Sequence, residues 1–201
     1  MTRIKFCGLR TLDDVFAANE IFPEYAGFVF APKSKRRVTP ETADELRGAL
    51  SKKILAVGVF VDEKISSVAE LLNFGTIDIA QLHGAEDDAY IKNLRTLTRK
   101  PIIKAFKVHS ADDLTTAEKS SADFVLLDAG AGDGRTFDWR LLKNFRREYF
   151  LAGGLTAQNV GGAIELLKPF AVDVSSGIEV AGKKNFDRMA TFAEVVRRND
   201  L

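Results

Sequence analysis

The one cysteine of the chain, Cys7, lies in the stretch KFCG near its start. A cysteine in a strand is usually a small buried apolar residue, but its thiolate can also take part in proton transfer. A lone cysteine cannot form an internal disulfide, and with only His83 and His109 present a Cys/His metal site is not expected. The role of Cys7 therefore depends on where the fold places it.

Asp128 ends the apolar run FVLLD. Such an aspartate commonly caps a helix or solvates a loop, but an acid that closes a buried strand can also donate a proton. Donation near neutral pH requires a pKa raised from about 4, by burial or by a nearby anion. A thiol base needs a nearby cation to lower its pKa of about 8.5. Cys7 and Asp128 could thus serve proton transfer if they share a cavity.

Two glycine-containing stretches could bind a phosphate group. They are LAGGLTAQNV, with Gly153 and Gly154, and VDVSSGIE, with Ser176 and Gly177. Glycines let backbone N–H groups approach an anion, and the N-terminus of a short helix adds positive potential. Either stretch alone could be an ordinary tight turn, so the prediction rests on the two occurring together.

The segment KSKRRV, residues 33–38, could bind a carboxylate. A run of charges is normally a solvated loop. It follows the apolar run FVFAP, however, and the planar guanidinium of an arginine is suited to holding a carboxylate by two hydrogen bonds.

The elements that must position these residues alternate along the chain. Short β-branched and aromatic runs are followed by segments with helical spacing of apolar residues. The predicted strands are 3–7, 25–30, 54–60, 77–82, 101–106, 123–128, 149–153 and 171–176, and the predicted helices are 11–20, 39–50, 63–74, 86–97, 111–119, 138–145, 157–167 and 186–198. This alternation predicts right-handed crossovers and a parallel sheet.

Eight such units predict an α/β protein with a single-domain (β/α)8 TIM barrel over residues 1–201. The length is near the minimum for this barrel, so we expect short loops and no second domain. An open doubly wound sheet is the alternative, but it usually carries a GxGxxG fingerprint after the first strand, where this chain has CGLRTLDD. Barrel active sites lie at the C-terminal ends of the strands, where the residues considered above fall.

Alternation along the strands predicts that Cys7 and Asp128 face one cavity. Lys5 and Cys7 share a face of the first strand, and Asp128 points inward if Val125 and Leu127 face the helices. Lys5 could lower the pKa of Cys7 directly. Alternatively it pairs with Asp173, which neighbours it when the barrel closes; we favour this pairing because an unpaired buried charge is costly.

Composition sets the remaining expectations. With 46% hydrophobic and 28% charged residues, the chain can bury a sizeable core. Its net charge of +1 gives no reason to expect nucleic acid or membrane partners. The charged start of the chain does not resemble a secretory signal, and no apolar run approaches a membrane span. We therefore expect a cytoplasmic protein with a small-molecule partner.

Several stretches together resemble the phosphoribosylanthranilate isomerase family of tryptophan biosynthesis, whose members are single-domain (β/α)8 barrels. The similar stretches cover essentially the whole chain in order: KFCGL, GFVFAPKSKRRV, VGVFVD, QLHGAE, FVLLD, GRTFDW, LAGGLTAQNV and VDVSSGIEVAGKKNFDRM. Members of this family act as monomers or homodimers, and either state is expected here.

The resemblance implies an Amadori rearrangement of N-(5′-phosphoribosyl)anthranilate to 1-(2-carboxyphenylamino)-1-deoxyribulose 5-phosphate, without cofactor or metal. By the same resemblance, Asp128 would be the acid that opens the furanose ring, Cys7 the base that removes the C2′ proton, and Arg36 the holder of the anthranilate carboxylate. The substrate phosphate would lie on backbone amides near the glycines described above. We also count Asp173 among the substrate-binding residues.

The chain departs from the family pattern in two loops. Ala131 and Asp133 stand where members often have a glycine and a hydroxyl residue, so lid closure or substrate affinity could differ. Lys35 stands where a proline is common and Arg37 adds a charge, which leaves open which arginine binds the substrate.

Two other functions compete with the isomerase. A phosphosugar aldolase or lyase of the same fold would need a Schiff-base lysine or a pair of acidic residues, and Lys104 is the plausible lysine; its ordinary role would be as a charge partner lining the barrel. A non-catalytic phosphate-binding barrel would leave Cys7 and Asp128 free to vary.

Overall fold

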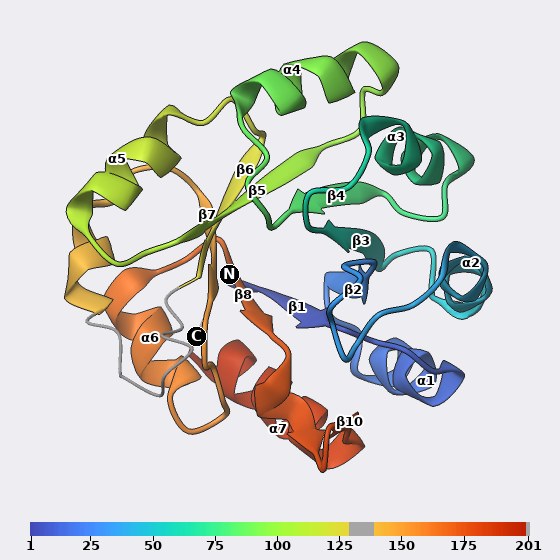
Figure 1. Ribbon diagram of the computed structural model, residues 1–201. Helices are drawn as coiled ribbons and strands as arrows, with labels where there is room; N and C mark the ends of the chain where they lie inside the picture. The colour runs from blue at the N-terminus through green and yellow to red at the C-terminus, as the bar shows by residue number, and fades with distance from the viewer. Residues whose placement is uncertain (129–138, 200–201) are drawn as a thin grey trace.

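The computed structural model describes residues 1–128 and 139–199. Among these residues, eight parallel strands close into a barrel in chain order, and β8 pairs with β1 to complete it (Figure 1). The strands are β1 (Arg3–Cys7), β2 (Tyr25–Val29), β3 (Leu55–Phe60), β4 (Ile79–Leu82), β5 (Ile102–Lys107), β6 (Phe124–Asp128), β7 (Tyr149–Ala152) and β8 (Ala171–Val174). The predicted barrel is confirmed, and the open-sheet alternative is wrong.

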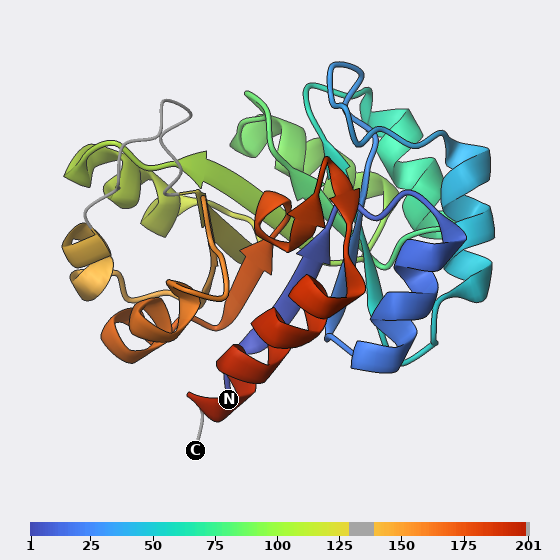
Figure 2. The ribbon, with the colours of Figure 1, turned by 90° about the horizontal axis from the view of Figure 1, so that it is seen from below.

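The α-helices lie on the outside of this barrel (Figure 2). They are α1 (Leu12–Ile21), α2 (Pro40–Ala49), α3 (Ile65–Phe74), α4 (Asp88–Leu97), α5 (Ala111–Lys119), α6 (Val160–Leu167) and α7 (Phe186–Arg198). None of the helices in the described ranges combines the length and apolarity needed to cross a membrane.

One predicted helix has a different form. The sequence predicts a helix over 138–145, but the structure contains a 3₁₀-helix, η1 (Trp139–Asn144). Leu142 is the residue that η1 buries, whereas its neighbour Leu141 is exposed. Trp139 is half-buried against the core. Helical segments of only six residues are marginal as α-helices and commonly take the 3₁₀ form, which explains the difference.

A small hairpin interrupts the passage from β8 to α7. A 3₁₀-turn, η2 (Ser176–Ile178), leads into β9 (Glu179–Val180), which pairs antiparallel with β10 (Lys183–Lys184). The sequence did not predict these two short strands. They carry two charged residues of the site described below.

Side-chain caps fix the start of α1, which follows β1, and the start of α7, which follows β10. Thr11 and Asp14 form a capping box at the start of α1, and the Asp14 carboxylate also accepts a hydrogen bond from the backbone N–H of Arg10. Asn185 caps α7 directly after β10. These caps hold the short segments that run from Cys7 and from Lys184 into their helices.

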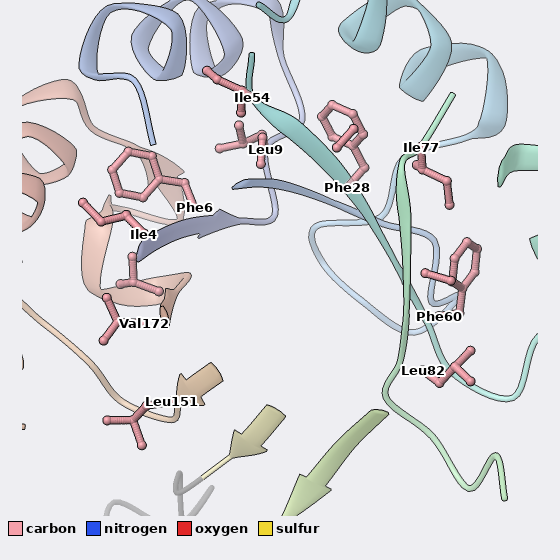
Figure 3. Close-up of a cluster of buried hydrophobic side chains, with 14 of the residues drawn as sticks. Ile4, Phe6, Leu9, Phe28, Ile54, Phe60, Ile77, Leu82, Leu151 and Val172 are labelled. Atoms are coloured by element: carbon pink, nitrogen blue, oxygen red, sulfur yellow. The ribbon is translucent and has the colours of Figure 1, made fainter. Parts of the chain in front are cut away.

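The buried side chains form an outer cluster between barrel and helices and an inner cluster within the barrel. Ile4 and Phe6 belong to the outer cluster (Figure 3), as do Val125 and Leu127. Since side chains alternate across a strand, the residues between and beyond them in β1 and β6 point inward. The predicted inward orientation of Cys7 and the residues that share its face is therefore confirmed.

Aromatic residues fill the barrel at the N-terminal end of the strands. The ring of Phe150 is fully buried and lies 5.2 Å from Tyr25, 6.0 Å from Phe124 and 5.6 Å from Phe170, measured between ring centroids. These rings close the end of the barrel opposite to the candidate site.

The Phe150→Ala variant is expected to lose about 3–5 kcal/mol of unfolding free energy, because it removes a fully buried ring and leaves a cavity. Chemical denaturation followed by circular dichroism measures the loss. Phe74→Ala is the matched control, because the Phe74 side chain is 78% exposed and its removal should change stability by less than about 0.5 kcal/mol. Equal losses in both variants would contradict this account of the core.

Candidate active site

A cavity of about 360 Å³ opens at the C-terminal ends of the strands. Its lining includes both residues predicted to carry out proton transfer, Cys7 and Asp128, together with three of the four predicted phosphate-binding residues. The full lining is Cys7, Val59, Gln81, His83, Asp128, Ala152, Gly153, Gly154, Leu155, Asp173, Ser175 and Ser176. The sequence prediction that these strand ends converge is confirmed by this geometry.

Cys7 lies at the end of β1 and packs against residues of β2 and β3. It forms a small buried cluster with Val29 and Val59. Gly27 is its partner on β2, and a Cβ atom there would lie 3.0 Å from the Cys7 sulfur, so glycine makes room for the thiol. Burial raises the pKa of the Cys7 thiol above its usual value, whereas the charges of Lys5 and Lys184 act to lower it.

Lys5 and Asp173 form a buried ion pair inside the barrel. They lie side by side because β1 pairs with β8 in the register that matches these two residues, and the distance from Nζ to Oδ1 is 2.9 Å. The favoured pairing is therefore confirmed. Burial acts against the charge of Lys5, but Asp173 and Cys7 outweigh it and raise the pKa of the ammonium group. Asp173 also reaches the cavity wall.

Asp128 contacts a histidine that an amide holds in place. The His83 Nε2 atom lies 3.5 Å from the Asp128 carboxylate, and the Gln81 amide nitrogen lies 2.8 Å from His83 Nδ1. An imidazole that accepts from Gln81 at Nδ1 carries its proton at Nε2, facing Asp128. The Gln81 carbonyl oxygen is buried without a hydrogen-bond partner among the described residues. The sequence placed Gln81 and His83 at a strand end but indicated no role for them.

The two glycine-containing loops lie against each other. Gly153 and Gly154 have φ angles of 101° and 62°, a region that favours glycine. A Cβ atom on Gly177 would lie 2.0 Å from the carbonyl oxygen of Leu155, so this close approach of the two loops requires glycine. Gly177 lines a neighbouring cavity of about 690 Å³, which shares Gly154, Leu155 and Ser176 with the first one.

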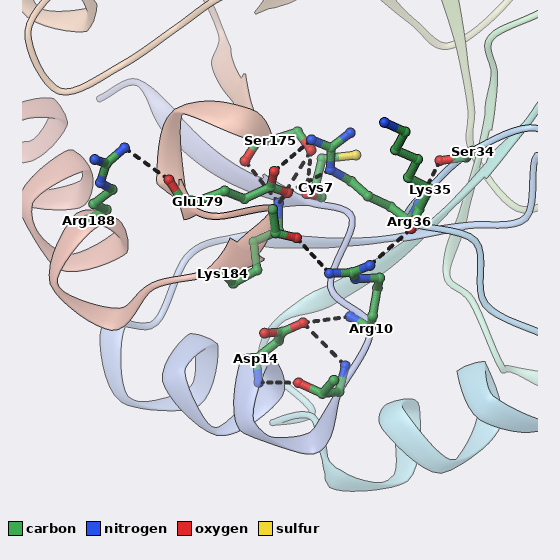
Figure 4. Close-up of polar contacts among 12 residues, drawn as sticks. Cys7, Arg10, Asp14, Ser34, Lys35, Arg36, Ser175, Glu179, Lys184 and Arg188 are labelled. Atoms are coloured by element: carbon green, nitrogen blue, oxygen red, sulfur yellow. Dashed lines mark hydrogen bonds and ion pairs between the residues drawn. The ribbon is translucent and has the colours of Figure 1, made fainter.

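Arg36 reaches the barrel mouth but is engaged by a carboxylate of the protein itself. Its Nε and Nη2 atoms donate to the two oxygens of Glu179 at 2.6 and 2.7 Å (Figure 4). Its side chain passes over Gly8, where a Cβ atom would lie 2.5 Å from Arg36 Cδ. Arg37 has an exposed side chain and pairs with Val29 through its backbone. Of the two candidate arginines, Arg36 is thus the one beside Cys7.

Glu179 and Lys184 are site residues that the sequence did not reveal. Lys184 donates to Glu179 at 2.8 Å and to the backbone carbonyl of Ser175 at 2.9 Å. Burial acts against the charge of Glu179, but hydrogen bonds from Arg36 and Lys184 outweigh it and lower its pKa to about 2. In the sequence these residues belong to a charged stretch typical of a solvated loop, so pattern alone gave no signal.

Lys104 is held by other partners, away from Cys7 and Asp128. Its ammonium group donates to the carbonyl of Gly84 at 2.7 Å and lies 3.1 Å from the carboxylate of Glu86. It lines a second cavity near α4 and α5, which shares His83 with the first one. An ammonium group with these partners is a charge partner in the barrel wall, which disfavours a Schiff-base mechanism at this lysine.

Two further sequence expectations concern a metal site and the loop that contains Ala131 and Asp133. Within residues 1–128 and 139–199, no set of three or more His, Cys, Asp or Glu side chains is arranged to hold a metal ion. The loop that departs from the family pattern, with Ala131 and Asp133, lies outside these described residues.

Fold and site together define a (β/α)8-barrel protein with the side chains for acid–base chemistry at its mouth. A family model described as N-(5′-phosphoribosyl)anthranilate isomerase matches residues 4–195. The chain belongs to the N-(5′-phosphoribosyl)anthranilate isomerase family.

Individual members of the family are similar to this chain over nearly its whole length. The chain is 42% identical to the N-(5′-phosphoribosyl)anthranilate isomerase of Endomicrobium trichonymphae, over 98% of this chain and 99% of the relative. The solved structure of the phosphoribosyl anthranilate isomerase of Thermotoga maritima superimposes with a TM-score of 0.90 at 35% identity, over 98% of this chain and all of that one. Another solved isomerase, with a TM-score of 0.88 at 35% identity and the same coverage of both chains, holds reduced 1-(o-carboxyphenylamino)-1-deoxyribulose 5-phosphate.

Proposed function

We propose that this chain catalyses the rearrangement of N-(5′-phosphoribosyl)anthranilate to 1-(2-carboxyphenylamino)-1-deoxyribulose 5-phosphate, a step of tryptophan biosynthesis. The observation that carries the proposal is that Cys7 and Asp128 line one cavity at the mouth of a barrel of this family. A relative of the same family binds a reduced form of the product, which supports the proposed substrate class.

The first step is ring opening by Asp128. The protonated carboxyl gives its proton to the furanose ring oxygen as the bond from C1′ to that oxygen breaks, and the nitrogen lone pair forms the C=N bond of a protonated Schiff base. The aspartate is left as a carboxylate, which the Nε2–H of His83, 3.5 Å away, can stabilise. Gln81 supports this step by holding the imidazole in the tautomer that donates to Asp128.

The second step is proton abstraction by the Cys7 thiolate. The thiolate takes the C2′ proton, the C–H electron pair becomes a C1′=C2′ bond, and the C=N π electrons return to nitrogen. The enolamine then tautomerises: the C2′ hydroxyl loses its proton, C1′ gains one and the C2′ ketone forms. The reaction needs a base and an acid facing the same sugar, and the common cavity of Cys7 and Asp128 supports this assignment.

The two anionic groups of the substrate would bind to different residues at the barrel mouth. Backbone N–H groups around Gly154, Ser176 and Gly177 are the proposed phosphate site, because the two loops approach closely there. The anthranilate carboxylate would bind Arg36, exchanging with or adding to the carboxylate of Glu179. Asp173, beside Cys7, would bind a sugar hydroxyl.

The proposal is tested with purified protein and phosphoribosylanthranilate in buffer without added metal or cofactor. We expect the fluorescence of the substrate to decay at a rate proportional to protein concentration. As a comparison, the protein is also assayed with a phosphosugar substrate of an aldolase or lyase that has the same fold. A lack of decay under these conditions would return the choice to the other barrel functions.

The Arg36→Ala variant is expected to raise KM by roughly 10- to 100-fold, because charge-assisted hydrogen bonds to the substrate carboxylate are lost. Arg37→Ala is the matched control and should leave KM near its original value, since the Arg37 side chain is exposed. Steady-state kinetics on both variants make the comparison. An unchanged KM in Arg36→Ala would remove the carboxylate-binding role while leaving the reaction itself in place.

Cytoplasmic location, a single domain over residues 1–201, and a monomeric or homodimeric state belong to the same proposal. The Thermotoga maritima relative is described as dimeric, with monomers generated from it, which supports considering both states. Cell fractionation, limited proteolysis and sedimentation velocity are the corresponding tests.

A further inference from the structure

Resting on the function proposed above, we propose that Lys184 is a positioning residue that supplies the positive charge needed to balance a Cys7 thiolate and fixes the main chain of Cys7 through Ser175. If Lys5 pairs with Asp173, the sequence leaves open which cation favours the Cys7 thiolate. The Lys5 charge lies next to Cys7, but Asp173 already pairs with it at 2.9 Å. Arg36 and Lys184 together face one carboxylate, Glu179, so these two cations leave one positive charge that can balance the thiolate.

The first support is a continuous chain of hydrogen bonds. Lys184 Nζ donates to the carbonyl of Ser175 at 2.9 Å and reaches its hydroxyl at 3.3 Å, and that hydroxyl donates to the carbonyl of Cys7 at 3.0 Å (Figure 4). The Lys184 side chain is only 2% exposed, so its charge is poorly screened by water. Lys184 is thus linked to Cys7 both through space and through the main chain.

The second support is the charge of the whole cluster. The charged groups nearest to Cys7 are Lys5 of β1, Arg36 of the loop after β2, Asp173 of β8 and Lys184 of β10. Glu179 of β9 joins Arg36 to Lys184. His83 and Asp128 face Cys7 across the cavity. On the Cys7 side, three cations stand against two carboxylates, so this side carries one surplus positive charge when the thiol is neutral. A thiolate makes it neutral. Removal of Lys184 would leave the thiolate as a surplus negative charge in a buried site, which is costly.

The third support is that the hairpin carrying Lys184 is fixed at several points. Arg188 of α7 donates to the carbonyl of Glu179 at 2.9 Å, and Arg10 donates to the carbonyl of Gly182 at 2.7 Å. Arg10 also donates to the carbonyl of Lys35 at 3.0 Å, which ties the hairpin to the loop of Arg36. The position of Lys184 relative to Cys7 is therefore set before substrate binds.

The test measures the thiol itself. Because Cys7 is the one cysteine of the chain, mass spectrometry of iodoacetamide alkylation against pH reports its ionisation without any substrate. For Lys184→Met, we expect the midpoint of the alkylation profile to rise by about one pH unit. The ascending limb of the pH profile of kcat/KM should shift to higher pH by a similar amount. Lys183→Met is the matched control, because the neighbouring Lys183 is exposed; its midpoint should not move.

Two further variants separate charge from structure. Lys184→Arg keeps the charge and should leave the midpoint closer to that of the original protein than Lys184→Met does. Glu179→Gln removes a negative charge and should lower the midpoint, the opposite direction, so general damage to the site cannot produce both shifts. If Lys184→Met does not fold, the direction of the Glu179→Gln shift decides.

The outcomes distinguish this inference from the proposed function. An unchanged midpoint in folded Lys184→Met, or a rise in Glu179→Gln, would overturn the role of Lys184 while the original protein still turns substrate over. If the original protein shows no turnover, the isomerase proposal fails, and the alkylation profiles still show whether Lys184 controls the thiol.

Discussion

The Cys7→Ser variant is expected to lose roughly 100- to 10,000-fold in kcat, the range usual for removal of a general acid or base. A serine hydroxyl has nearly the size of the thiol, so the pocket against Gly27 and Val59 should stay filled. A hydroxyl, however, does not ionise near neutral pH and cannot remove the C2′ proton. KM should change little, because the groups proposed to bind phosphate and carboxylate are untouched.

Steady-state kinetics and binding of a reduced product analogue measure the two effects separately. Cys7→Ala is the second variant, since it also lacks a base and should be about as slow as Cys7→Ser. Unfolding curves of both variants establish that the barrel is intact. Near-normal turnover in either variant, with the analogue still bound, would remove Cys7 from the mechanism.

The Asp128→Asn variant is expected to show a loss of similar size, again roughly 100- to 10,000-fold in kcat. The amide keeps the shape of the side chain and its contact distance to His83 but cannot give a proton to the ring oxygen. Ring opening would then become the slow step. The analogue of the opened product should still bind, because its ring no longer has to be opened.

Asp123→Asn is the matched control for this variant. Asp123 lies just before β6, at the other end of the barrel from Asp128, and its carboxylate accepts a hydrogen bond from the backbone of Ile102. Its replacement should cost some stability but leave kcat close to the original value. Comparable losses of kcat at both positions would point to damage of the strand rather than to removal of an acid.

The barrel and its helices could be predicted because local sequence and fold agree. The apolar runs of the strands and the apolar periodicity of the helices match the observed elements within a few residues. The segment 138–145 is the exception. Its apolar residues suggest a helix, but among the described residues 139–145 only Leu142 is fully buried, and a 3₁₀-helix forms.

The candidate site could be predicted only in part. Cys7 and Asp128 were found because strand alternation is regular and the strand ends of a barrel share one face. Glu179 and Lys184 were missed because their importance comes from a hairpin of two-residue strands that folds back over the mouth. No periodicity marks so short an element, and its charges resemble those of an exposed loop.

The sequence by itself determined the fold class, the family, and the face of the barrel on which the thiol, the carboxyl and the glycines lie, because strand alternation and motif order are local properties. The tertiary structure alone decided how the charges over the barrel mouth pair. Arg36 and Lys184 share Glu179, whereas the pairing of Lys5 with Asp173 was already expected from strand alternation and barrel closure. Charge pairing depends on distances of a few ångströms between residues far apart in the chain, and these distances are set only when β8 closes against β1 and the hairpin packs on the mouth.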